Sequence, residues 1–267
     1  MNKMKKVYNI LLKEYGPQGW WPIIDNKTLL CEYGTGAPKN ELEVLEICIG
    51  AILAQGTQWK PNVVTSLRQL KLGRELTKEE QEVIKELEKV SKKISKKRQK
   101  TIQNNILTQN TNWNNVEKAL KNLRPITVNR LDKISENDLD KLIKPSGYYN
   151  QKAKKIKFFI KFLKEKNKIN RKNLLGIWGL GPETVDSILL YAYNQPYFVI
   201  DAYTKRIFSR LGYEYKTYDE WQQFFHENVN KKIYKEYHAL LVEHAKRFCT
   251  TKPKCKKCSL KELCQFR

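Results

Sequence analysis

The sequence predicts an all-α fold, and three observations support this class. Apolar residues recur at spacings of three and four along most of the chain, strand-like alternation is almost absent, and Gly or Pro stands where helices would end. With 267 residues and 40% hydrophobic content, the chain is long enough to bury a core in one large domain or two modest ones. The spacing predicts helices over residues 43–54, 116–123, 151–163, 183–193, 202–211 and 231–248.

The chain is strongly basic, since 51 Lys and Arg residues outnumber 28 Asp and Glu residues and give a formal net charge of +23. This excess favours a polyanion such as nucleic acid as the partner, although a general bias towards lysine also contributes to it. No apolar run reaches the roughly 20 residues that cross a bilayer, and residues 1–16 do not resemble a signal peptide. We therefore expect a cytoplasmic, nucleoid-associated protein that does not bind a membrane.

Two segments of the chain have similar sequences. Residues 51–70 resemble residues 105–123, so that Gln55 and Gln109 occupy equivalent positions. The charged stretch between them, residues 76–100, has only a narrow apolar stripe and is interpreted as an inserted or duplicated helix with a solvated face.

A glycine pair marks a predicted hairpin of two helices at about 174–193. Gly179, Leu180 and Gly181 form a tight turn, and Pro182 suits the first turn of the second helix. Such a turn directs backbone N–H groups at one point, where they can hold a phosphate oxygen. A packing turn between two helices is the competing interpretation.

An apolar run then leads to Asp201 at the start of the next predicted helix. An aspartate at this position usually caps the helix. Beside a phosphate-binding hairpin it can also present a carboxylate to a cationic sugar.

Four cysteines close together predict a metal centre. Of the six cysteines, Cys31 and Cys48 stand alone, whereas the others follow the pattern C-x5-C-x2-C-x5-C. Four thiolates at this spacing can bind zinc or a [4Fe-4S] cluster, and we favour the cluster because zinc ribbons usually present two separated pairs. The three histidines have no metal-like spacing to these cysteines and are predicted to be surface or core residues. The expected ligands are Cys249, Cys255, Cys258 and Cys264.

Together, the Gly-Leu-Gly hairpin, the run Val199-Ile200-Asp201 and the terminal four-cysteine loop resemble the helix-hairpin-helix DNA glycosylases of the endonuclease III superfamily. The resemblance covers nearly the whole chain and includes "AILAQGT" at 51–57 and "KPSGYYNQKAKKI" at 144–156. The stretch "YGPQGWWPI" looks like the branch that excises uracil or 3-methyladenine.

The resemblance implies a monomeric base-excision enzyme that removes a damaged base, such as uracil or an alkylated or oxidised purine, from double-stranded DNA. One lobe would span residues 43–198 and end in the hairpin, and the other would combine 1–42 with 199–267 and carry the cluster loop at 249–264. Asp201 would be the catalytic residue, and the base would rotate out of the duplex into a pocket between the lobes. The hairpin residues expected to bind DNA are Gly179, Leu180, Gly181 and Thr184.

Two further roles depend on this resemblance. Either Gln55 or Gln109 would probe the duplex, and the sequence does not separate them. Trp20 and Trp21 would stack on the extruded base, or else belong to the core.

The sequence departs from the bifunctional members of the superfamily at one position. Those enzymes carry a lysine nucleophile just before the Thr of the hairpin, where this chain has Glu183, so we expect a monofunctional glycosylase. Lys205 is the nearby amine that keeps a lyase activity open as an alternative. Two competing interpretations are a non-catalytic DNA-binding module and an electron carrier, and the electron carrier leaves the hairpin unexplained.

Overall fold

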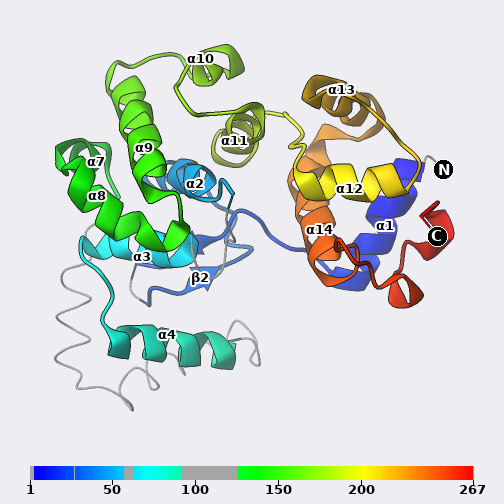
Figure 1. Cartoon of the computed structure of the whole chain (residues 1–267), viewed down its shortest axis with the longest axis horizontal. Coiled ribbons are helices and arrows are strands. Elements are labelled where there is room, and N and C mark those ends of the chain that lie inside the picture. Colours follow the sequence, from blue (N-terminus) through cyan, green and yellow to red (C-terminus); the bar gives the residue numbers. More distant parts are fainter. Residues whose placement is uncertain (1–2, 27, 57–62, 92–125, 267) are drawn as a thin grey trace. The chain divides into compact units, whose positions relative to one another are not determined.

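The computed structural model describes residues 3–26, 28–56, 63–91 and 126–266, which are mostly helical (Figure 1). The predicted all-α class is confirmed. In the described part of the chain the strands are β1 (Ile23–Ile24) and β2 (Cys31–Glu32), which pair antiparallel. The chain divides into two compact units, and each is described by itself. The first unit comprises residues 1–22, 33–39 and 168–267, and the second comprises 23–32 and 40–167.

The second unit is a group of helices around α2, which bears the most apolar sequence. The packed pairs are α2 with α3, α3 with α8, and α9 with α2, α7 and α8. Asn40 caps α2 by accepting a hydrogen bond from the N–H of Glu43, and nearly every residue from Leu45 to Leu53 is buried. Its helices are α2 (Glu41–Leu53), α3 (Val64–Leu72), α4 (Lys78–Ser91), α7 (Val128–Lys133), α8 (Glu136–Ile143) and α9 (Tyr149–Lys164).

A buried ion pair holds the short strands against these helices. Lys71 Nζ of α3 lies 2.6 Å from Glu46 Oε2 of α2, and both side chains are almost fully buried. Glu46 also accepts from the N–H of Ile24, while Lys71 donates to the carbonyl of Ile24. Burial raises the pKa of the Glu46 carboxyl, and Lys71 opposes that rise. Strand β1 has only two residues and both are buried, which explains why no apolar alternation marks it in the sequence.

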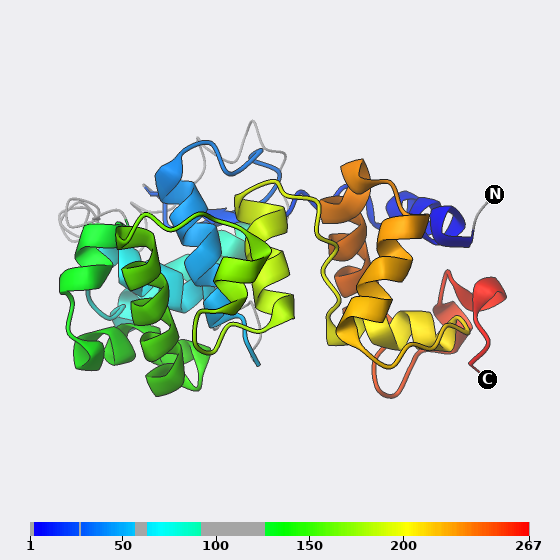
Figure 2. The ribbon, with the colours of Figure 1, turned by 90° about the horizontal axis from the view of Figure 1, so that it is seen from above.

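In the first unit α14 packs on both α1 and α12 (Figure 2). Aromatic side chains form much of the core of this unit. The Phe198 ring stacks on Phe225 with centroids 4.1 Å apart, and Phe208 and Tyr237 pack edge-on to the Phe225 ring. The α-helices of this unit are α1 (Lys3–Tyr15), α10 (Arg171–Leu175), α11 (Pro182–Ser187), α12 (Ala202–Arg210), α13 (Tyr218–Asn228) and α14 (Tyr234–Arg247).

The hairpin belongs to the first unit, whereas the sequence analysis places it at the end of the 43–198 lobe. The boundary falls at 167/168 because hairpin side chains bond within the carboxy-terminal part of the chain. Asp186 accepts from Gln222 of α13, and the Tyr191 hydroxyl meets His238 of α14. Three predicted features lie outside the described residues: the helix at 116–123, the segment at 105–123 that resembles 51–70, and Gln109.

The predicted helix at 183–193 is irregular. Helix α11 ends at Ser187 and continues as the π-helical turn η3 (Ile188–Ala192), closed by a bond from the N–H of Tyr193 to the carbonyl of Ile188. Such a turn accommodates one residue more than an α-helical turn. It places Tyr191 in the segment that packs against α14.

Candidate active site

The hairpin has the backbone geometry that its sequence requires. Asn170 caps α10 by accepting from the N–H of Asn173, and Gly179 adopts a left-handed conformation with φ of 81°, which favours glycine. Gly181 directly precedes α11, and a side chain there would meet no heavy atom within 4 Å. The turn is therefore open where the first backbone N–H groups of α11 begin, as binding of a phosphate by the backbone requires.

Asp201 is buried, and its two carboxylate oxygens have different neighbours. Oδ1 accepts from the N–H of Thr204 at 2.7 Å and so caps α12. Oδ2 lies 3.5 Å from His238 Nε2 of α14. The predicted capping role is thus real, but it uses one oxygen, and the other faces a buried histidine.

A tyrosine supports that histidine. The Tyr191 hydroxyl lies 2.7 Å from His238 Nδ1 and 3.2 Å from the carbonyl oxygen of Lys235. When the hydroxyl donates to Nδ1, the neutral imidazole carries its proton on Nε2, and an N–H then faces Asp201. Sequence reasoning missed this role of His238, because no local spacing marks it.

Two opposing effects set the pKa of Asp201. Burial disfavours the charged carboxylate, but hydrogen bonding and positive charge from His238, together with the N–H of Thr204, favour it. The net effect lowers the pKa of Asp201, so this carboxylate is negatively charged at neutral pH.

Glu183, at the start of α11, feels the charge of Asp201. Desolvation by neighbouring protein atoms raises the pKa of the Glu183 carboxyl, and the negative charge of Asp201 raises it further. His238 and Lys205 oppose the rise. Glu183 is therefore electrostatically coupled to Asp201, although it supplies no amine.

The predicted tryptophan pair lies beside the same histidine. The Trp20 ring centroid is 5.9 Å from that of His238, and the Trp21 centroid is 5.0 Å from that of Tyr191. Trp21 is buried, whereas Trp20 is only half-buried. The backbone N–H of Gly19 donates to Glu236 of α14 and so anchors the loop before the tryptophans.

Gln55 belongs to the second unit, just after α2. Its Oε1 accepts from Lys155 Nζ of α9 at 2.7 Å. Since Gln109 lies outside the described residues, either glutamine still fits the predicted role of duplex probe.

The four predicted cysteine ligands gather near α12 and α14. Cys249 Sγ accepts from an Arg210 guanidinium N–H at 3.2 Å, and Cys264 Sγ lies 3.3 Å from the carbonyl oxygen of Arg210. Cys258 Sγ lies 3.4 Å from His244 Nε2, and burial and the other three cysteines raise the pKa of its thiol, opposed by a backbone bond. Within the described ranges no three Cys, His, Asp or Glu side chains are placed to share one metal ion.

A helical hairpin followed by a buried aspartate at the next helix start defines a class of DNA repair glycosylases, and comparison with known proteins agrees. Residues 104–231 match the family described as "HhH-GPD superfamily base excision DNA repair protein". The putative DNA repair glycosylase MJ1434 of Methanocaldococcus jannaschii is 47% identical over 179 residues, covering 60% of this chain and 81% of the relative. Endonuclease III of Thermotoga maritima is 31% identical over 169 residues, covering 60% and 79%. The chain belongs to the HhH-GPD superfamily and is a DNA repair glycosylase of the endonuclease III type.

Solved structures agree with this fold. The 3-methyladenine DNA glycosylase of H. pylori, bound to 1,N6-ethenoadenine, superposes with a TM-score of 0.59 at 23% identity and covers 92% of this chain and 98% of its own. A thermostable thymine-DNA glycosylase gives a TM-score of 0.62 at 16% identity, covering 99% of this chain and 96% of its own.

Among the described helices, none is long and apolar enough to cross a bilayer.

Proposed function

We propose that the chain is a monofunctional DNA glycosylase in which Asp201 stabilises the sugar cation and orients the attacking water. The observation that carries the proposal is the buried Asp201 carboxylate, one oxygen of which faces His238 at 3.5 Å. A lowered pKa keeps this group negative, and a fixed negative charge is what an oxocarbenium-like transition state needs.

The reaction divides among groups of the first unit. Backbone N–H groups at the Gly179–Gly181 turn bind a phosphate of duplex DNA that carries a damaged base, and Trp20 offers a π-face to the extruded base. The bond between C1′ and the base nitrogen breaks, and the base takes the electron pair. Water then adds to C1′ beside Asp201, and the proton it gives up ends on the departing base. The products are a free base and an abasic site.

Glu183 supports the monofunctional assignment. A lyase needs an amine that attacks C1′ and forms a Schiff base, and a carboxylate cannot do so. A candidate amine is Lys205, whose charge acts on Glu183 and whose Nζ lies 5.8 Å from the centroid of the Tyr218 ring. Borohydride should trap no covalent adduct with a lesion-bearing duplex, and strand cleavage should require alkali or heat. A trapped adduct would show a lyase.

The four cysteines fit a [4Fe-4S] cluster by their donor chemistry, because thiolates are the ligands of such clusters. We propose that Cys249, Cys255, Cys258 and Cys264 hold it, with the Arg210 guanidinium donating to Cys249. The cluster would supply a structural crosslink for the terminal loop. Purified protein should be brown with about four irons, and Cys258→Ser should lose the colour. Colourless protein with stoichiometric zinc contradicts the assignment.

Base release tests the proposal directly. Monomeric protein is incubated with duplexes that each carry one lesion, either uracil or an alkylated or oxidised purine. The free base released is then measured. Asp201→Asn should retain DNA binding and slow base release by about 10²- to 10⁴-fold, the scale of one acid–base or electrostatic group. Glu227→Gln, which neutralises an exposed carboxylate on α13, is the matched control. Full activity of Asp201→Asn removes the proposed catalytic residue.

A further inference from the structure

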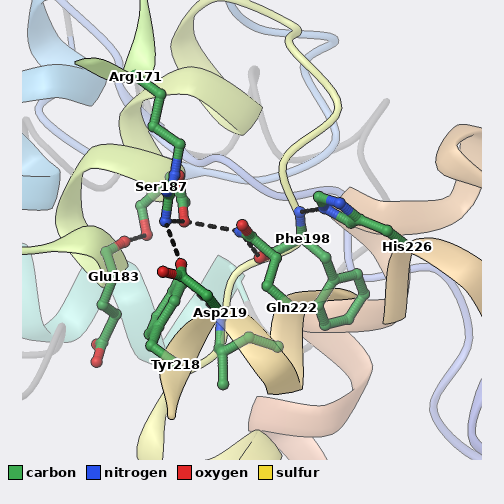
Figure 3. A network of polar contacts seen from close by, with 10 residues as sticks. Arg171, Glu183, Ser187, Phe198, Tyr218, Asp219, Gln222 and His226 are labelled. Atoms are coloured by element: carbon green, nitrogen blue, oxygen red, sulfur yellow. Dashed lines mark hydrogen bonds and ion pairs between the residues drawn. The ribbon is translucent and has the colours of Figure 1, made fainter. Parts of the chain in front are cut away.

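A second buried carboxylate lies in the hairpin itself. Asp186 of α11 has no solvent exposure. Its Oδ1 accepts from Arg171 Nε at 2.8 Å, and its Oδ2 accepts from Arg171 Nη2 at 3.3 Å and from Gln222 Nε2 at 2.7 Å (Figure 3). The Tyr218 hydroxyl lies close enough to this carboxylate that burial and the charge of Asp186 both raise its pKa. Because a buried carboxylate needs several donors, this cluster fixes the position of each partner.

Arg171 and Asp186 belong to the two different helices of the hairpin. Arg171 is the first residue of α10, and Asp186 lies near the end of α11. Their two-pronged contact therefore holds the hairpin helices in one geometry, as expected of a guanidinium and a carboxylate. Arg171 also donates to the exposed Asp219 at 3.1 Å.

Gln222 and Tyr218 carry the contact to the chain segment before Asp201. The Nε2 group of Gln222 donates one N–H to Asp186 and the other to the carbonyl of Phe198 at 2.8 Å. The Tyr218 hydroxyl accepts from the N–H of Ile200 at 3.3 Å. Both residues lie on α13, so side chains of one helix hydrogen-bond to the backbone at Phe198 and Ile200, just before Asp201 (Figure 3).

Two further contacts hold the segment that precedes Asp201. The N–H of Phe198 donates to His226 Nε2 at 3.1 Å, and the Phe198 ring stacks on Phe225. Phe198 and Ile200 are almost fully buried. The segment thus has little freedom to move independently of α13.

We propose that Asp186 is a positioning residue: through Gln222 and Tyr218 it fixes Asp201 relative to the hairpin. The inference rests on the proposed function, in which the hairpin binds a DNA phosphate and Asp201 acts at the sugar. A phosphate held by the hairpin then sets the place of C1′, and the clamp of Asp186, Gln222 and Tyr218 sets the place of the carboxylate. An error of about 1 Å in such a placement can cost about 10²-fold in rate.

Gln222→Met tests the clamp, because methionine keeps the length of the side chain and removes both N–H donors. Single-turnover base release at saturating enzyme should fall by about 10- to 100-fold, while affinity for an undamaged duplex changes by less than about threefold. The matched control is Gln223→Met, because Gln223 is the exposed neighbour on α13 and its side chain bonds to Glu227. Its rate should equal that of the unaltered protein.

Tyr218→Phe gives an independent test in case Gln222→Met does not fold, since it keeps the ring and deletes the contacts with Ile200 and Asp186. It should slow base release with DNA affinity unchanged. An unaltered rate in a folded variant, or equal losses of rate and DNA affinity, overturns the clamp. Asp201→Asn is assayed in the same experiment to separate the two proposals. If Asp201→Asn is fully active, the proposed function is wrong. If Asp201→Asn is inactive but Gln222→Met is fully active, only the clamp is wrong.

Discussion

A buried lysine in the second unit makes stability depend on pH. Lys152 of α9 is 1% exposed, and its Nζ donates to the carbonyl of Leu53 at 2.8 Å and to that of Ser146 at 2.7 Å. Burial, with a smaller effect of Lys155, lowers the pKa of Lys152 from 10.5 to about 8. The two carbonyls belong to the end of α2 and to the turn before α9, so the amine joins these segments.

The size of the effect follows from this pKa difference. At 1.36 kcal/mol for each factor of ten, holding the charged amine in the fold costs about 3 kcal/mol at pH 7. Above pH 10.5 the amine is neutral in both states and the cost is absent. The cost grows as the pH falls from 10.5 towards 8 and is constant below that range. From pH 7 to pH 9 the contribution of Lys152 to folding therefore becomes more favourable by about 1 kcal/mol.

Urea unfolding at pH 7, 8 and 9 measures this contribution as a difference between variants. The free energy of unfolding of the unaltered protein minus that of Lys152→Met should rise by about 1 kcal/mol over this interval, because groups common to both chains cancel. Lys154→Met, which alters an exposed lysine on the same helix, should give a constant difference. A constant or falling difference for Lys152→Met would refute the reasoning.

Three further predictions concern the site, the core and DNA binding. His238→Gln should move the acidic limb of the base-release pH profile to higher pH, because Asp201 loses the hydrogen bond and charge that lower its pKa; an unmoved limb contradicts this. Glu46→Gln should cost about 3–5 kcal/mol in urea unfolding, since Lys71 remains buried without its partner, and a loss below about 1 kcal/mol contradicts it. For undamaged duplex, log K should fall linearly with log[salt] by about 0.9 per phosphate neutralised, whereas a flat response would argue against phosphate contacts.

The sequence predicts the parts of the site that local patterns encode. Gly179 and Gly181 mark the hairpin because a turn at those positions needs particular backbone conformations, and Asp201 stands out because an apolar run leads to it. The tryptophan pair stands out because the two residues are adjacent; Trp20 lies beside His238 and Trp21 beside Tyr191, and their stacking on a base stays a prediction.

The remaining parts depend on residues that are distant in the chain. His238 meets Tyr191 across 47 positions and Asp186 meets Gln222 across 36, and no periodicity of either segment records such a partner. The unit boundary differs from the predicted lobe boundary for the same reason, since side chains such as Asp186 join the hairpin to α13. Strand β1 is not predicted because it has only two residues, both buried, and so short a segment shows no alternation.

The π-helical turn at Ile188–Ala192 makes the geometry of this site depend on the number of residues in the turn. Each residue of a helix advances about 100° around the axis, so removing one residue between Ser187 and Tyr191 would turn the tyrosine away from His238 while leaving composition almost unchanged. The deletion would favour a regular helix and would deprive the imidazole of its hydroxyl partner. When relatives are aligned, a one-residue gap here therefore distinguishes chains that can place a tyrosine at the histidine from chains that cannot. Counting residues across this turn is as informative as reading their identities.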